Sequence, residues 1–176
     1  MPEYLEKEVL VLGCGNILFG DDGFGFHVVN RLNELKTGGA GSSCDASVLS
    51  NDKIGFIDAG TGASHFILSL IDESTIIRKI IIVDIVDYGL VPGEMIKLYP
   101  KDLPNIPKYQ IDAHDMPLAG MLVDLNKDFG IDVVVVGCQY KNMPAPDICM
   151  DLSPEAEGSI DKAVDMVLDE LQMLEF

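Results

Sequence analysis

Several residue types are scarce in this sequence of 176 residues, and their scarcity excludes some classes of protein. Tryptophan is absent, and the chain has only 12 Lys and Arg against 29 Asp and Glu, a formal net charge of −17. Binding to duplex nucleic acid or to an anionic membrane surface needs clusters of Lys and Arg, so neither function is expected. The charge balance favours a neutral partner, a basic partner or a metal ion.

Long apolar runs and paired cysteines are missing as well. The longest apolar runs, such as Ile80–Val83, are far shorter than the roughly 20 residues that span a bilayer. The first eight residues are charged and lack the apolar core of a signal peptide. The 4 cysteines lie far apart with no Cys-x-x-Cys pair, which excludes a ribbon-type zinc site. Such cysteine usage fits a reducing cytoplasm, where we expect the protein to reside.

The apolar content of 48% is enough for a full core, and the length predicts one domain over residues 1–176. Four short runs end at Gly, Asp or Cys and are typical of strands buried on both faces of a parallel sheet. These runs are Val9–Leu12, Ile54–Ile57, Ile80–Val83 and Val133–Val136. Three segments between or beside these runs have apolar residues at helical spacing, namely residues 24–35, 66–71 and 114–128. An apolar stripe at helical spacing also runs from Ile160 to Leu174. Before that stripe, Ser153 is a candidate N-cap and Pro154 suits the first helical position.

The segment Glu94–Tyr99 alternates polar and apolar residues after the turn signal Val91-Pro92-Gly93. This pattern predicts an edge strand that can run antiparallel. The whole pattern predicts a three-layer α/β/α sandwich around a five-stranded, mostly parallel twisted sheet with one antiparallel edge strand.

Acidic residues follow three of the expected strands. In open α/β sheets, ligands bind at the carboxyl ends of the strands, which is where these acids lie. Asp22 follows the first strand and Asp84 the third, while His114 lies in a loop that opens a helix. Two carboxylates and an imidazole suit a divalent ion such as zinc, nickel, cobalt or manganese. In the alternative interpretation, Asp21 and Asp22 cap the first helix and Asp84 only ends a strand.

The glycines and cysteines near these positions raise two alternatives, a nucleotide site and a thiol nucleophile. Gly13-Cys14-Gly15 resembles the start of a dinucleotide fingerprint, but Leu18 stands where its third glycine should be. The acids that follow would also repel a pyrophosphate. Neither a Gly-x-Ser-x-Gly elbow nor a His-Glu-x-x-His helix is present. A thiol nucleophile, Cys14 or Cys138, stays open as an alternative.

The segment from Leu12 to Gly25, LGCGNILFGDDGFG, resembles the N-terminal signature of the [NiFe]-hydrogenase maturation endopeptidases. Three further segments agree in order, namely Asp58–Thr61, Val83-Asp84 with the Gly93 turn, and Ala113-His114. The resemblance covers essentially the whole chain. Residues 136–141 are similar to the branch of the family that serves the coenzyme F420-reducing hydrogenases of methanogenic archaea.

This resemblance implies an endopeptidase that removes the C-terminal extension of a hydrogenase large-subunit precursor after nickel insertion. It implies that Asp22, Asp84 and His114 are the metal-contacting and catalytic residues of an aspartic or metal-dependent enzyme. The metal would be nickel, either the enzyme's own or borne by the substrate, with zinc as the alternative. It also implies a five-stranded sheet whose fourth strand is antiparallel at an edge.

Other residues are expected around that centre. The substrate cleft would be lined by Gly15, Asn16, Gly60, Thr61, Gly62 and Cys138. Asp21, Asp87 and Asp115 either orient the ligands or act as cap and turn residues.

Two other functions are alternatives to the endopeptidase. One is a non-catalytic metal-sensing or chaperone-like module, and the other is a Rossmann-type nucleotide-binding domain. The expected partner is the large-subunit precursor, with no nucleic acid, no membrane and a monomeric chain.

Overall fold

The computed structural model describes residues 3–38, 46–72, 74–102 and 118–175, and in this part of the chain five strands form one sheet in the order β2-β1-β3-β5-β4. The parallel strands are β1 (Val9–Cys14), β2 (Ile54–Gly60), β3 (Lys79–Val86) and β5 (Asp132–Gln139). The edge strand β4 (Met95–Leu98) runs antiparallel to β5. The predicted sheet, including its antiparallel edge strand, is confirmed.

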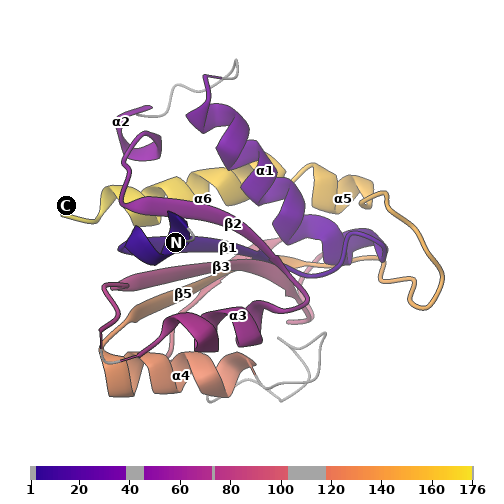
Figure 1. Ribbon diagram of the computed structural model, residues 1–176. Coiled ribbons are helices and arrows are strands. Elements are labelled where there is room, and N and C mark those ends of the chain that lie inside the picture. The colour runs from indigo at the N-terminus through magenta and orange to yellow at the C-terminus, as the bar shows by residue number, and fades with distance from the viewer. Residues whose placement is uncertain (1–2, 39–45, 73, 103–117, 176) are drawn as a thin grey trace.

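Helices cover both faces of this sheet (Figure 1). One face carries α1 (Phe24–Lys36) and α6 (Ile160–Gln172) with the short helices α2 (Ala46–Leu49) and α5 (Pro154–Glu157). The other face carries α3 (Ala63–Leu70) and α4 (Leu118–Phe129). Two 3-10 turns, η1 (Glu3–Glu6) and η2 (Gly20–Gly23), precede β1 and α1. The three-layer α/β/α architecture is therefore confirmed.

The apolar runs are continuous because each central strand has a buried layer on both sides. In β1, Val9 and Val11 pack with α1 and α6, while Leu10 and Leu12 pack with α3 and α4. Successive side chains of a strand point to opposite faces, so a strand covered on both sides needs apolar residues throughout.

The last predicted helix, with Ser153 as its N-cap, is divided into two helices in the structure. The Ser153 hydroxyl accepts a hydrogen bond from the Ala156 N–H at 3.3 Å, and Pro154 begins α5, as predicted. That helix ends at Glu157 with Gly158 as its C-cap, and the stripe from Ile160 onward belongs to the separate helix α6.

The predicted capping of α1 by Asp21 or Asp22 is wrong. Gly23 occupies the N-cap position of α1, which has no side-chain cap. Both acids instead lie in η2 and accept hydrogen bonds from backbone N–H groups of other segments. The predicted helix over 114–128 corresponds to α4, and its first four residues lie outside the described part of the chain.

Among the described residues, no helix combines the length and the hydropathy that crossing a bilayer would require.

Candidate active site

The carboxyl ends of β1, β2 and β3 bring together the residues that follow these strands. Cys14 at the end of β1 is paired with Gly60 of β2, and Gly13 is paired with Val83 of β3, directly before Asp84. The Gly15 N–H donates to the Gly60 carbonyl oxygen at 3.1 Å, which joins the two loops that leave β1 and β2.

Asp22 is held against the end of β1 by a tight backbone approach. Gly15 has a φ of 108°, and a Cβ at this position would collide with the Asp22 carbonyl oxygen. The Asn16 N–H donates to Asp22 Oδ2 at 2.9 Å, and the Asp22 residue is only 2% exposed. A Cβ on Gly25 would likewise collide with the backbone of Cys14 and of Val83. These glycines therefore let the start of α1 pack directly on the ends of β1 and β3.

Asp84 approaches the same place from β3. It is 8% exposed, and its Oδ1 accepts a hydrogen bond from the Ile85 N–H at 2.8 Å. Burial raises the pKa of the Cys14 thiol well above its usual value, and the charges of Asp84, Asp58 and Asp22 raise it further. Three carboxylates thus act on one buried thiol, and the structure brings Asp22 and Asp84 to the same end of the sheet.

The thiols are poorly suited to act as nucleophiles. The Cys14 residue is 5% exposed, and its raised pKa keeps it protonated near neutral pH. Burial, together with the charge of Asp21, raises the pKa of Cys138 to about 12. A thiolate is the reactive form of cysteine, so both positions disfavour thiol catalysis.

Cys138 also does not line a cleft, in contrast to the expectation from sequence. It is 0% exposed and packs with α1 and α6, on the opposite face of the sheet from Cys14. The reason is the two-residue period of a strand, which turns position 138 of β5 into the core.

The other residues expected in the cleft do lie at the strand ends. Gly15, Asn16, Gly60 and Gly62 are half-buried and Thr61 is exposed. The Asn16 Oδ1 accepts a hydrogen bond from the Leu18 N–H at 3.0 Å, so its amide NH₂ group is directed elsewhere.

His114 and Asp115 lie outside the described residues, so the predicted His114 contact stays a prediction. Among residues 3–38, 46–72, 74–102 and 118–175, no group of three or more His, Cys, Asp or Glu side chains is placed to hold a metal ion.

Asp21 has a structural role that the sequence did not reveal. It is fully buried, and its Oδ2 accepts hydrogen bonds from the Lys141 and Asn142 N–H groups at 2.8 and 2.9 Å. The Ser153 N–H and hydroxyl also donate to its carboxylate, at 2.6 and 2.9 Å. Asp21 therefore fixes both ends of the segment between β5 and α5.

Two further polar residues shape the site without having been selected from sequence. Asp58 lies near the carboxyl end of β2, accepts the Gly60 N–H at 3.0 Å and acts electrostatically on Cys14. Gln139 ends β5, and its Oε1 accepts the Tyr88 and Leu90 N–H groups at 2.8 and 3.2 Å, which orders the loop after β3. Its Nε2 donates to Asp87 at 3.3 Å. The position of Asp58 and Gln139 shortly after apolar runs is the sequence signal by which both could have been selected.

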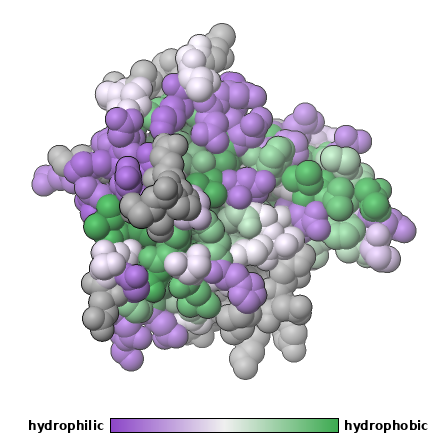
Figure 2. All heavy atoms as spheres, in the orientation of Figure 1, coloured by the Kyte–Doolittle hydropathy of each residue, from purple (hydrophilic) through white to green (hydrophobic). Residues whose placement is uncertain are grey.

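Exposed apolar side chains gather beside this end of the sheet, in the segment between β5 and α5. Ile148, Met150 and Met143 are 72%, 57% and 42% exposed. The Cys149 N–H donates to the Leu18 carbonyl oxygen at 2.9 Å, which places this segment next to the Asn16 loop. The corresponding area is hydrophobic at the right of Figure 2. Such an exposed apolar area suits contact with another protein.

The geometry does not suit a dinucleotide. In a nucleotide-binding turn, free backbone N–H groups at a helix N-terminus receive the phosphate. Here the Asn16 N–H is already bonded to the Asp22 carboxylate, and α1 begins only at Phe24.

Comparisons with known proteins agree on one family. The family model described as HycI, hydrogenase maturation protease, matches residues 40–170. A putative hydrogenase maturation protease of Methanocaldococcus jannaschii is 42% identical over 95% of this chain and 98% of its own length. The delta subunit of the coenzyme F420 hydrogenase of Methanothermobacter thermautotrophicus is 40% identical over 94% of this chain and 96% of its own.

Solved structures share the fold. The hydrogenase maturating endopeptidase HybD of Escherichia coli superimposes with a TM-score of 0.69 at 25% identity, covering 94% of this chain and 92% of that one. The maturation protease HycI of Thermococcus kodakarensis gives a TM-score of 0.67 at 20% identity, covering 94% and 93% of the two chains.

Proposed function

Because the chain belongs to the hydrogenase maturation protease family, we propose that it is an endopeptidase that removes the C-terminal extension of a [NiFe]-hydrogenase large-subunit precursor after nickel insertion. The observation that carries the proposal is the convergence of Asp22 and Asp84, two nearly buried carboxylates, at the end of the sheet where the family motif lies. The similarity to the F420 hydrogenase delta subunit favours the large subunit of a coenzyme F420-reducing hydrogenase as the substrate.

Asp22 and Asp84, with His114 as the third ligand, would hold a divalent metal. The donor set fits such an ion, because carboxylates and imidazole bind nickel and zinc and leave positions for substrate or water. We favour nickel that is already lodged in the precursor, and therefore part of the substrate. A bound divalent ion would polarise the scissile carbonyl and lower the pKa of a coordinated water.

The backbone fixes both carboxylates before any ligand arrives. One oxygen of Asp22 accepts the Asn16 N–H, and one oxygen of Asp84 accepts the Ile85 N–H. These bonds set the orientation of each carboxylate, which limits the reorganisation needed on binding.

Residues of the two neighbouring loops would receive the substrate backbone. Gly60 has no side chain to keep an extended peptide away, and only the Gly15 carbonyl oxygen, at 3.9 Å, lies near its Cβ position. Asn16 would donate its amide NH₂ to the scissile carbonyl oxygen, since its Oδ1 is already occupied by the Leu18 N–H. The exposed apolar residues beside the Asn16 loop would contact the folded part of the precursor.

The decisive experiment measures the mass of the precursor after incubation with the protein, with and without nickel. Wild type should release the C-terminal extension only from nickel-loaded precursor. Asp84→Asn and His114→Ala should lose at least a hundredfold in cleavage rate, because each removes a metal contact, while their circular dichroism spectra stay unchanged. Cleavage by His114→Ala at the normal rate would refute the metal site.

The same assay separates catalysis from binding alone. Wild-type protein that binds nickel-loaded precursor without changing its mass would be a metal-sensing or chaperone-like module instead. A monomeric, cytoplasmic protein without nucleic-acid or membrane partners is part of this proposal.

A further inference from the structure

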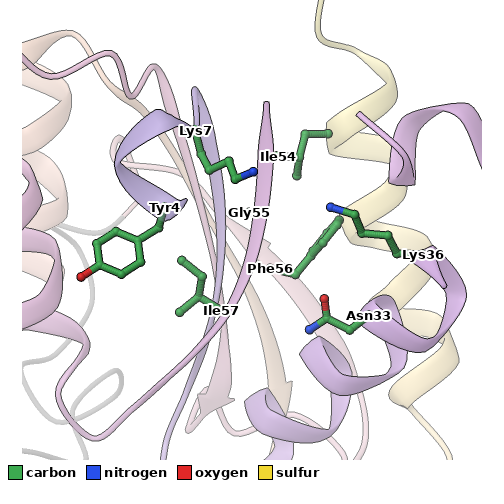
Figure 3. A pocket seen from close by; sticks show the side chains of 8 residues that line it. All are labelled: Tyr4, Lys7, Asn33, Lys36, Ile54, Gly55, Phe56 and Ile57. Atoms are coloured by element: carbon green, nitrogen blue, oxygen red, sulfur yellow. The ribbon is translucent and has the colours of Figure 1, made fainter. Parts of the chain in front are cut away.

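A pocket of about 270 Å³ opens on the outer edge of β2, apart from the candidate active site. Figure 3 shows Lys7, from the segment before β1, on one side of β2, and Asn33 and Lys36, from α1, on the other. Lys36 Nζ lies 5.8 Å from the centre of the Phe56 ring, at the middle of the strand. We call this feature the β2-edge pocket.

The charge of the β2-edge pocket is opposite to that of the chain. The protein has a net charge of −17, but the described residues that line this pocket include two lysines and no Asp or Glu. Lys7 Nζ donates to the Asp52 carbonyl oxygen at 2.9 Å, so the ligand contact is assigned to Lys36. For Lys36, the described residues provide the Phe56 ring and no salt bridge. The pocket therefore favours a carboxylate ligand.

The backbone beside the pocket can accept another strand. β2 is the first strand in the sheet order, so among the described strands it pairs only with β1. Alternate residues of a strand direct their N–H and C=O groups to opposite edges. The Lys53 carbonyl oxygen accepts the Val9 N–H at 3.1 Å, so the backbone N–H and C=O groups of Gly55 and Ile57 also point toward β1. The backbone groups of Phe56, which lies between them, point to the free edge. Edge strands with such groups bind extended peptides by strand addition.

The strand also connects the pocket to the candidate active site. Phe56 lines the pocket, and Gly60, four residues later, contacts the Gly15 loop through the 3.1 Å hydrogen bond. At about 3.3 Å per residue, this path is roughly 13 Å long. One extended segment of four or five residues can therefore lie on the edge of β2 with one end at the Asn16 and Asp22 loop and the other in the pocket.

We propose that the edge of β2 binds the precursor's C-terminal extension as an added strand, with an acidic side chain of the extension in the β2-edge pocket against Lys36. This proposal rests on the proposed function for the identity of the partner. Main-chain hydrogen bonds to β2 hold the extension in an extended form, and the contact with Lys36 sets its register relative to the scissile bond.

The test measures the affinity of the full chain for nickel-loaded precursor by biolayer interferometry, in an Asp84→Asn background that prevents cleavage. In this background, Lys36→Glu should weaken binding at least tenfold. Lys127→Glu makes the same charge change on the exposed surface of α4 and should stay within twofold of its parent. Deletion of the extension from the precursor should weaken binding as much as Lys36→Glu does, and the two changes together should have no additional effect. Replacement of the acidic residues of the extension by Lys should restore binding to the Lys36→Glu variant.

Equal affinities of the Lys36→Glu and Lys127→Glu variants would overturn the proposal. So would a full effect of Lys36→Glu on a precursor that lacks its extension, because the contact would then be with the folded body. The affinity could instead fall when the precursor's terminal carboxylate is blocked, while the Lys replacements fail to restore binding. That result would identify the terminal carboxylate as the ligand and overturn the proposed side-chain contact. Because these arms measure binding, the expected pattern in the Asp84→Asn background, combined with a wild-type protein that does not cut the precursor, would refute the proposed function and leave the docking site intact.

Discussion

At the scale of single residues, Gly15 controls the shape of the candidate active site. Its φ of 108° disfavours any side chain, and a Cβ would also collide with the Asp22 carbonyl oxygen. We expect Gly15→Ala to displace Asp22 and to reduce precursor cleavage at least a hundredfold. Gly130→Ala is the matched control, because Gly130 also has a positive φ, of 67°, but nothing lies within 4 Å of its Cβ position. That variant should cost only about 1–2 kcal/mol in the free energy of unfolding, the strain of the left-handed conformation, and keep its activity. Equal activities of the two variants would show that the contact with Asp22 is unimportant.

Asp21 is a second residue whose single replacement should have a large effect. Its carboxylate accepts two backbone N–H groups at one end of the segment between β5 and α5 and two donors of Ser153 at the other. In Asp21→Asn, one acceptor oxygen becomes an NH₂ group that faces buried donors. We expect a loss of about 2–4 kcal/mol in the free energy of unfolding, since hydrogen bonds to a buried charged group are worth ~1.5–3 kcal/mol each. Urea denaturation measures this loss, with Asp87→Asn, a change at an exposed position, as the control. A difference below about 0.5 kcal/mol between the losses of the two variants would contradict the structural role of Asp21.

At the scale of secondary-structure elements, a buried ion network joins β3, β4, β5 and α6 at the end of the sheet away from the candidate site. Glu170 of α6 accepts Lys79 of β3 at 2.9 Å and Lys97 of β4 at 3.0 Å, and Lys79 also donates to Asp132 of β5 at 2.7 Å. The Tyr99 hydroxyl donates to Glu170 at 3.1 Å as well. Burial would raise the pKa of Glu170, but the hydrogen bonds and charges of the two lysines outweigh it and lower this pKa below its usual value of 4.5. The network therefore stabilises the ionised form of Glu170.

The stability that Glu170 contributes should depend on pH. Because its pKa is lower in the folded protein than in the unfolded chain, its contribution is fully present above pH 4.5 and is lost as the pH falls through the folded pKa. We expect Glu170→Gln to lower the free energy of unfolding by about 2–4 kcal/mol at pH 7, since it leaves Lys79 buried beside fewer charges. The difference from wild type should shrink at pH 3. Urea titrations at both pH values measure it, with exposed Asp169→Asn as control. A difference independent of pH would assign the loss to packing instead.

The sheet could be predicted from the sequence because its apolar runs are short, β-branched and buried on both faces. The boundary between α5 and α6 could not, since the N-cap signal of Ser153 and Pro154 lies only a few residues before the apolar stripe from Ile160 and is compatible with one continuous helix. At the candidate site, Asp22 and Asp84 could be selected because Asp84 follows an apolar run and Asp22 lies in the connection after another, and such positions meet at one edge of a sheet. The role of Asp21 could not, because its partners are backbone N–H groups about 120 residues away, which carry no residue-type signal. Cys138 was misplaced because a pattern along the chain does not show which face a strand residue occupies at the strand's end.

At the scale of the whole molecule, the excess of acidic residues should make stability depend on salt. A net charge of −17 produces repulsion between surface carboxylates, which destabilises the compact state. Dissolved salt screens exposed charges beyond about 10 Å at 0.1 M, whereas the buried Glu170 network is screened much less. The free energy of unfolding should therefore rise between 0.02 and 0.5 M NaCl at pH 7, by about 1 kcal/mol, comparable to one pair of like charges 4 Å apart in water.

The control for this prediction uses the protein's own titration. At pH 4.2, the isoelectric point expected from the sequence, the net repulsion disappears, and the same salt series should leave the free energy of unfolding nearly constant. A rise with salt of equal size at both pH values would point to a general effect of salt on burial of apolar surface. A fall with salt at pH 7 would mean that attractive surface pairs, such as Lys53 with Glu8 at 2.7 Å, outweigh the repulsion. The expected pattern, a rise at pH 7 that is absent at pH 4.2, arises only if the acidic surface repels itself. A protein with such a surface would admit an acidic peptide only where cations are concentrated, as they are beside β2.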